Sequence, residues 1–167
     1  QAGGNPEASE PVGGARGDTL DGAGGADVLR GGAGDDLYLI DVAGDRVEEL
    51  AGEGHDTVRA SLSWSLARWL EVEDLVLQGL GDLSASGNAR ANRLEGNAGA
   101  NVLDGGGGLD TLVGGPGSDT YRVHASTTTA VVEREGDAAG AHDLVLLLEE
   151  DEDLAMGGER VGGIAGL

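Results

Sequence analysis

The chain of 167 residues contains no cysteine, no lysine and no phenylalanine, and only two tryptophans and two tyrosines. Without cysteine, it has neither disulfides nor thiolate zinc sites. The shortage of aromatic side chains argues against a thick core, so the core must be thin and built from Leu, Val and Ala. No apolar run approaches the roughly 20 residues that a membrane-spanning helix needs, and we predict no membrane span.

Basic residues are also scarce. Ten arginines face 31 acidic residues, and the formal net charge is -21. A chain without a basic stripe is unsuited to nucleic acid, which we exclude as a partner. Self-repulsion of this size opposes a compact state unless counterions bind, so metal cations or polycations are the expected partners.

The start of the chain, QAGGNPEASEP, lacks the charged beginning and the apolar middle of a secretory signal. Because the first residue is not Met, we expect a fragment or a processed product of a larger parent. H-E-x-x-H and G-x-S-x-G are both absent, so the segment has neither a zinc-protease motif nor a hydrolase elbow. We therefore predict that it is not an enzyme.

Glycine is abundant, with 33 residues, and it recurs in a nine-residue frame. The frames GGARGDTLD, GAGGADVLR and GGAGDDLYL follow one another over 13–39. A degenerate copy, AGEGHDTVR, ends this block, and its Asp56 and Val58 are two residues out of phase. The frame returns over 87–122 as GNARANRLE, GNAGANVLD, GGGGLDTLV and GGPGSDTYR. The sixth position is Asp or Asn and the eighth is Leu or Tyr in every one of the seven strict copies.

This frame resembles G-G-x-G-x-D-x-U-x, the nonapeptide of the RTX family of hemolysin-type calcium-binding repeats. A disordered Gly/Asp-rich linker is the alternative, but disorder does not demand an apolar residue at every eighth position. The resemblance implies an all-β fold, a parallel β-roll or β-helix solenoid of calcium-binding nonapeptide repeats, with an irregular C-terminal cap.

Calcium explains why acids and glycines share these loops. The ion takes 6–8 oxygen ligands from carboxylates and backbone carbonyls, and glycine permits the sharp turns that let carbonyls converge. In the RTX family, a calcium lies between loops 18 residues apart. The first loop gives the carbonyls of positions 1 and 3, the second gives those of positions 2 and 4, and both give the sixth-position carboxylate.

Carried over to the first block, the resemblance implies three sites. The predicted ligands are Gly13, Ala15 and Asp18 with Gly32, Gly34 and Asp36; Gly22, Gly24 and Asp27 with Asp41 and Asp45; and Gly31, Ala33 and Asp36 with Gly52, Gly54 and Asp56. The last two loops are 20 residues apart instead of 18, which weakens that assignment.

In the second block, asparagine replaces aspartate in two loops. The predicted sets are Gly87, Ala89 and Asn92 with Gly106, Gly108 and Asp110; Gly96, Ala98 and Asn101 with Gly115, Gly117 and Asp119; and Gly114, Pro116 and Asp119 with Asp143. Gly105, Gly107 and Asp110 have no recognisable partner loop further along the chain. Because Asn keeps an oxygen but removes the charge, we expect its two sites to be weak or vacant, and a stacked Asn ladder is the alternative.

We divide the chain into a flexible lead-in (1–12), a first repeat block (13–58), a connecting β-coil (59–86), a second repeat block (87–123) and a cap (124–167) that could contain part of a secretion signal. The connecting segment alternates like a strand at Leu62, Trp64 and Leu66, with an outward loop near Arg68–Asp74; a short helix at Ser65–Val72 is the alternative. Leu144–Leu148 is predicted to be a buried strand.

The resemblance implies a calcium-binding domain that folds after secretion into an extracellular, calcium-rich medium. Its rigid roll would support the folding, stability and type I export of an N-terminal catalytic, toxin or adhesin domain. The alternatives are a glycan-binding module like those appended to alginate epimerases, an adhesin repeat segment, and an enzyme that acts on polysaccharide along a β-helix face.

Overall fold

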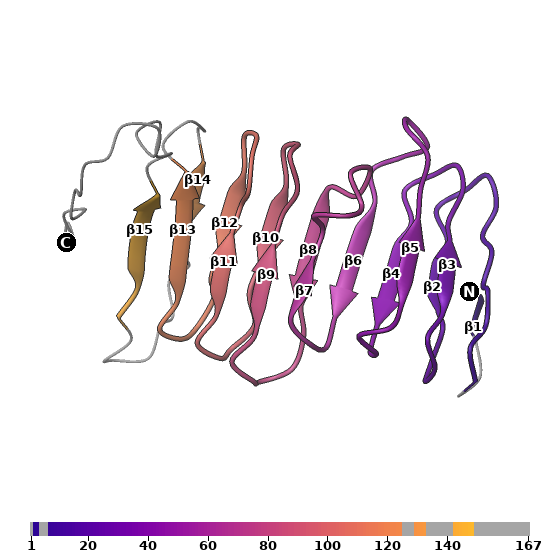
Figure 1. The fold of residues 1–167 in the computed structure, drawn as a ribbon, viewed down its shortest axis with the longest axis horizontal. Coiled ribbons are helices and arrows are strands. Elements are labelled where there is room, and N and C mark those ends of the chain that lie inside the picture. The colour runs from indigo at the N-terminus through magenta and orange to yellow at the C-terminus, as the bar shows by residue number, and fades with distance from the viewer. Residues whose placement is uncertain (1, 4–6, 125–128, 133–141, 149–167) are drawn as a thin grey trace, which may run out of the picture.

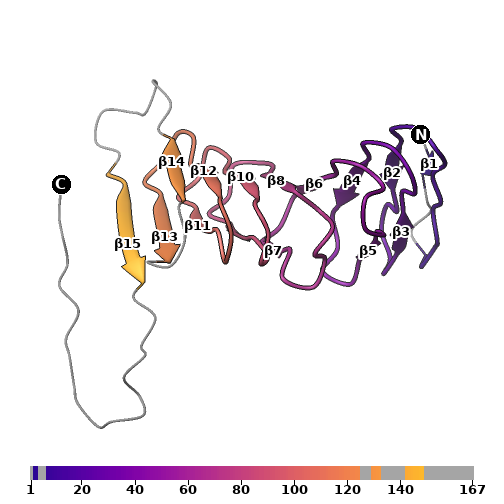
Figure 2. The ribbon, with the colours of Figure 1, turned by 90° about the horizontal axis from the view of Figure 1, so that it is seen from above.

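In the computed structural model, which describes residues 2–3, 7–124, 129–132 and 142–148, the regular structure is β-strand throughout. The strands are two to five residues long and pair in parallel, so the chain winds as a solenoid of about six turns. They lie side by side along the long axis, from β1 at one end to β15 at the other (Figure 1). Viewed from above, they form two rows (Figure 2). The predicted all-β parallel roll is confirmed. No helix in these ranges is long and apolar enough to cross a membrane.

The strands form three parallel sheets. The eight-stranded sheet contains β1 (Ala2–Gly3), β2 (Thr19–Asp21), β4 (Leu37–Ile40), β6 (Thr57–Ala60), β8 (Asp74–Leu77), β10 (Arg93–Glu95), β12 (Thr111–Val113) and β14 (Ala130–Val132). The opposite face contains a two-stranded sheet, β3 (Val28–Arg30) and β5 (Arg46–Glu48), and a five-stranded sheet of β7 (Trp64–Ser65), β9 (Ser84–Ser86), β11 (Val102–Asp104), β13 (Thr120–His124) and β15 (Leu144–Leu148).

An inward side chain from the middle of most strands builds the core, and β4, β6 and β8 each add a second one, at Ile40, Ala60 and Leu77. The eighth residue of every strict repeat is fully buried, and those side chains are Leu20, Leu29, Tyr38, Leu94, Leu103, Leu112 and Tyr121. The strands of the connecting segment add Leu75 and the small Ala85 to the same row. Burial of one such leucine is worth about 1.5–3 kcal/mol, but one or two such side chains per strand make a thin core.

The turn length departs from 18 residues in the middle of the chain. Asp36 stacks on Asp56 across 20 residues, Asp56 on Glu73 across 17, and Ser63 on Ser84 across 21. Extra residues go into the turns between strands, so the inward row continues through the connecting segment. This continuity agrees with the predicted alternation at Trp64 and Leu66, both buried.

The second face is interrupted between β5 and β7, which belong to separate sheets, and Arg46, Glu49, Arg68 and Trp69 line a cleft there. We call this cleft the seam. The helix considered at Ser65–Val72 is wrong: Trp69 N–H bonds to Leu66 C=O at 2.8 Å in a tight turn. That turn stacks the Trp69 ring on Trp64, with centroids 4.9 Å apart and planes 6° from parallel.

The two ends of the roll differ from the sequence-based expectation. Within the segment expected to be a flexible lead-in, Ser9 C=O accepts the Val28 N–H and Val12 bridges to Arg30, so this part joins the coil. Leu144–Leu148 is a strand as predicted but is not buried: Val145 is 44% and Leu147 62% exposed, because β15 is the last strand of its sheet. Most of the predicted cap lies outside the described residues.

Candidate calcium sites

Three of the aspartate loops share one backbone conformation. In loops 31–36, 105–110 and 114–119, the glycines at the second and fourth positions have positive φ, from 78° to 145°. Side chains are strained in this region, and glycine is not. A methyl group at these positions would also run into the stacked loop, as at Gly115, where it would lie 3.0 Å from the Asn97 carbonyl. Glycine therefore allows both the turn and the close stacking.

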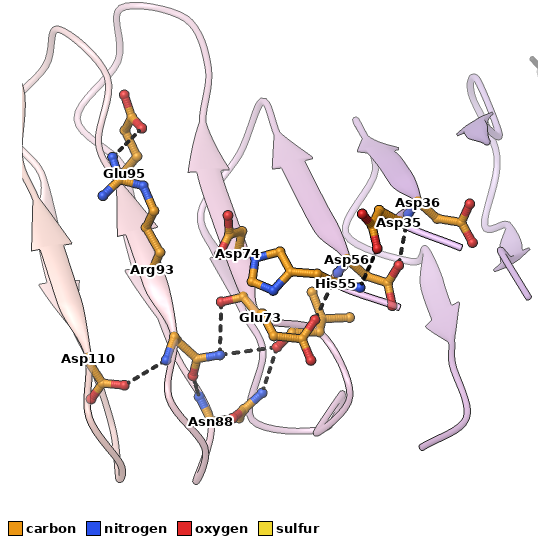
Figure 3. A network of polar contacts seen from close by, with 12 residues as sticks. Asp35, Asp36, His55, Asp56, Glu73, Asp74, Asn88, Arg93, Glu95 and Asp110 are labelled. Atoms are coloured by element: carbon orange, nitrogen blue, oxygen red, sulfur yellow. Dashed lines mark hydrogen bonds and ion pairs between the residues drawn. The ribbon is translucent and has the colours of Figure 1, made fainter. Parts of the chain in front are cut away.

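A ladder of carboxylates connects the stacked loops. All sixth-position residues of the strict repeats except Asp110 donate their N–H to Oδ1 of the aspartate one turn later, at 2.6 Å from Asp18 to Asp36 and 3.1 Å from Asp27 to Asp45. The Asp36–Asp56 step is 2.9 Å long, and it continues from Asp56 N–H to Glu73 Oε2 at 2.8 Å (Figure 3). Loop stacking alone thus aligns the acids in a row.

The second oxygen of these carboxylates is turned inward. Asp27 Oδ2, Asp36 Oδ2 and Asp110 Oδ2 are buried, and none has a hydrogen-bond partner among the described residues. Each lies against the first glycine of its own loop, so closely that a methyl group there would overlap it. A buried anionic oxygen without a donor is costly, and a cation is the partner that such an oxygen lacks. The aspartate loops therefore fit calcium.

Electrostatics points the same way. Burial is the main cause that raises the pKa of Asp36, Asp45 and Asp110. Burial, together with the charges of Glu73 and Asp36, raises the pKa of Asp56 to about 6. Each shift means that the anion is unfavourable in the folded chain without a countercharge, which a bound cation supplies.

The predicted first-block partners lie as follows. Loop 13–18 stacks on loop 31–36, which places Gly13, Ala15 and Asp18 beside Gly32, Gly34 and Asp36. Asp27 meets Asp45, whereas Asp41 is exposed. Loop 31–36 also stacks on loop 52–56, through hydrogen bonds from Gly34 N–H to Glu53 C=O and from Asp36 N–H to Asp56. Gly52 is not part of this close stacking, since a methyl group placed on it would meet no atom within 4 Å.

The structure describes two further pairings near the second block. Asp119 N–H donates to Asp143 Oδ1 at 2.7 Å across 24 residues, so these two predicted partners are together. The strand pairing of β12 with β14 gives Asp110, which lacked a recognisable partner loop, a neighbour in Thr129. The carbonyl residues Gly114, Pro116 and Gly117 lie in the same loop as Asp119, and their metal roles stay predictions.

The asparagine loops have a different geometry. No residue of loops 87–92 and 96–101, both described throughout, has a positive φ. The Asn92 amide donates to the Val72 and Glu73 carbonyls at 3.1 Å, and the Asn101 amide donates to Leu83 C=O at 3.3 Å and Asn97 Oδ1 at 3.0 Å. The side-chain oxygens of Asn92 and Asn101 lie against the first glycines of their loops, as the inward aspartate oxygens do elsewhere. They accept the Asn88 and Asn97 N–H groups at 2.7 and 2.8 Å, which favours the stacked Asn ladder over metal ligation.

Asparagine at the second position strengthens this arrangement. Asn88 Nδ2 donates to the Trp69 and Val72 carbonyls, and its Oδ1 accepts the Arg90 N–H at 2.8 Å. Asn97 repeats the pattern with Gln78, Gly81 and Gly99. The Asn side chain closes the turn that a positive-φ glycine closes elsewhere. Asparagine side-chain amides thus hold both of these loops in place. The loops contain four of the predicted carbonyl ligands, Gly87, Ala89, Gly96 and Ala98.

Sequence reasoning missed three residues at these sites. Ser9 donates its N–H and its hydroxyl to Asp27 Oδ1 at 2.6 and 2.8 Å. Thr129 serves Asp110, and Glu49 lies within 4.8 Å of Asp36 and Asp56, measured between one oxygen of each. Ser9 lies 18 residues before Asp27, so extending the nine-residue phase upstream would have found it. Thr129 and Glu49 lie outside the nonapeptide frame, and only the stacking of the turns reveals them.

Comparison with known proteins agrees with this geometry. A family model, the RTX calcium-binding nonapeptide repeat, matches residues 12–39 and 86–121 in four copies. Comparison with curated proteins and with solved structures gave no significant match. The matched segments contain the stacked aspartate loops, and repeats of this family bind Ca²⁺. The chain thus contains RTX calcium-binding nonapeptide repeats over these two segments of its β-roll, and these repeats bind several calcium ions.

Proposed function

We propose that calcium completes the folding of this roll after secretion, and that the rigid roll then supports the folding, stability and export of a parent protein. The observation that carries the proposal is the row of buried, inward carboxylate oxygens at Asp27, Asp36 and Asp110. Their desolvation opposes folding until a cation arrives. Binding free energy is then available as folding free energy.

The thin core supports the same proposal. Most turns bury one side chain per strand, and apolar burial on that scale barely offsets the conformational entropy of ordering a glycine-rich chain. The net charge of -21 adds self-repulsion. Extracellular calcium modules bind at about 10⁻⁴–10⁻³ M, so such a chain stays incompletely folded in a calcium-poor cytosol and folds outside the cell.

A calcium titration of the far-UV circular dichroism of the 167-residue chain, from a calcium-stripped start, tests this proposal. We expect a cooperative gain of β-signal between about 10⁻⁵ and 10⁻³ M calcium. Magnesium should not reproduce it, because that smaller ion demands near-ideal octahedral geometry and holds its waters. A β-signal that is already complete without calcium would show that calcium does not drive folding.

Glycan binding is a second candidate, favoured by the seam. Trp69 is partly exposed there and lines the cleft together with Arg46 and Arg68, and an aromatic side chain with guanidinium groups in one cleft suits an acidic sugar. Binding of an acidic polysaccharide in saturating calcium, lost in Trp69→Ala, would support this role. Equal retention of the wild type and Trp69→Ala on that polysaccharide would exclude it.

A further inference from the structure

Glu49 lies where the repeat pattern places its first glycine. The pairing of β3 with β5 sets Arg30 opposite Glu48, so the residues that follow, Gly31 and Glu49, occupy equivalent places in successive turns. Gly13 takes this place one turn earlier, since its N–H bonds to the Arg30 carbonyl. The third turn thus brings a carboxylate to a position where every strict repeat has glycine.

The Glu49 carboxylate meets other oxygens at one point. A methyl group on Gly31 would overlap Asp36 Oδ2, the Tyr38 hydroxyl and Glu49 Oε1, so these three oxygens converge beside the Gly31 backbone. Asp36 is 2% and Tyr38 0% exposed. In the part of the chain that the structure describes, Asp36 Oδ2 and the Tyr38 hydroxyl are buried without a hydrogen-bond partner. The Glu49 oxygens are buried too, and the backbone N–H of Gly31 is the donor that faces them.

The second block supplies an internal comparison. Gly114 and Tyr121 hold the same positions in their frame as Gly31 and Tyr38, and there the Gly114 N–H donates to the Tyr121 hydroxyl at 3.0 Å. Tyr38 lacks that bond. The same tyrosine, in the same repeat, is therefore satisfied by backbone in one block and lies in a cluster of acidic oxygens in the other, where Glu49 is the added group.

The spacing of the acids fits a single calcium ion. One ligand oxygen from each of Asp36, Glu49 and Asp56 lies within 4.8 Å of the other two. Two oxygens bound to one calcium at 2.3–2.6 Å can be at most about 5 Å apart. Glu49 also lines the seam, which gives an ion a path from solvent to the buried oxygens.

We propose that Asp36, Glu49 and Asp56 bind one calcium ion together. The Glu49 side chain is then a ligand at the position where the repeats offer only a glycine carbonyl. This inference rests on the calcium binding of the roll and adds a ligand to one of its sites. Calcium affinity rises with the number of charged ligands. Three carboxylates make this site the tightest in the chain and the first to fill.

Calorimetric calcium titration of the full chain tests the proposal with Glu49→Gln, which keeps the shape and removes the charge. Its matched control is Glu48→Gln, the neighbouring residue, whose side chain is 52% exposed and pairs with Arg30. We expect the tightest binding step to weaken at least about tenfold in Glu49→Gln and to stay unchanged in Glu48→Gln. A wild-type first step in Glu49→Gln would overturn the proposal.

Two further measurements separate ligation from a role in folding. Glu49→Gly puts at this position the glycine that the strict repeats have there. The variant should therefore keep the roll but lose the tightest calcium-binding step. Calcium should also raise the melting temperature of Glu49→Gln by less than that of Glu48→Gln; equal gains would overturn the proposal. If the wild-type chain bound no calcium at all, the proposed function itself would fail, whereas failure at Glu49 alone would leave it intact.

Discussion

In calcium-stripped buffer, acid should stabilise the roll instead of denaturing it. Burial, followed by the charges of Asp56 and Asp36, raises the pKa of Glu49 from 4.5 to about 8, and the pKa of Asp56 rises from 3.8 to about 6. Below pH 4 both acids are protonated in the folded and the unfolded chain. Between pH 4 and 8 the unfolded chain ionises first, so the free energy of unfolding falls as the pH rises.

The expected size follows from these two groups. One pKa unit corresponds to about 1.36 kcal/mol. The ionisation of Glu49 alone would therefore lower the free energy of unfolding by up to about 5 kcal/mol between pH 4.5 and 8. The seam leaves Glu49 partly hydrated, which screens the charge, and we expect a combined loss of about 3 kcal/mol from both acids. Saturating calcium should reverse the trend, because its ligands must be deprotonated to bind.

Urea unfolding of the calcium-stripped chain at pH 5 and pH 8, followed by circular dichroism, measures this difference. Glu49→Gln should remove most of the pH dependence and Glu48→Gln should leave it unchanged, since Glu48 is half-exposed and bonded to Arg30. Stability that is equal at both pH values, or higher at pH 8 without calcium, would refute the reasoning about the buried acids.

Three further predictions concern the coil itself. Leu103→Ala should cost about 2–5 kcal/mol in urea unfolding with saturating calcium, whereas Leu109→Ala, at a side chain 67% exposed, should change stability by less than about 0.5 kcal/mol. Ala23 has a positive φ of 57° at the second position of its loop, where loops 31–36, 105–110 and 114–119 have glycine, so Ala23→Gly should stabilise the chain by up to about 1 kcal/mol. Gly115→Ala should destabilise it by about 1–2 kcal/mol by the same measurement. Asn101→Ala should cost about 1–3 kcal/mol equally with and without calcium, since its amide bonds only to protein; a loss confined to calcium-loaded protein would instead make Asn101 a ligand.

The coil and its aspartate row could be predicted from the sequence because their determinants lie within nine residues. A glycine at positions two and four, an aspartate at six and an apolar residue at eight define the turn, the ligand and the core of each copy. Asp18 and Asp27 accordingly stack with the partners expected from the 18-residue spacing. Asp36 and Asp119 stack with their predicted partners at 20 and 24 residues. The resemblance to the RTX repeat predicted which loops stack on one another.

The remaining features depend on how unequal turns stack, which no local pattern encodes. Glu49 reaches Asp36 and Asp56 because the pairing of β3 with β5 sets it opposite Gly31, at a position that the frame assigns to glycine. The asparagine loops illustrate a second limit: Asn92 and Asp110 occupy the same position in their frames, but the amide of Asn92 bonds to carbonyls of the preceding turn. The identity of those carbonyls lies outside the repeat.

The position of calcium in crystals of the calcium-loaded chain tests the central claim most directly. Anomalous scattering at long wavelength should show ions between Asp18 and Asp36, between Asp27 and Asp45, and at Asp36 with Asp56, and no ion held by the Asn101 side chain. Ions found only on the exposed acids, with the inward oxygens of Asp27 and Asp36 unligated, would contradict the account of this roll as a calcium-binding fold.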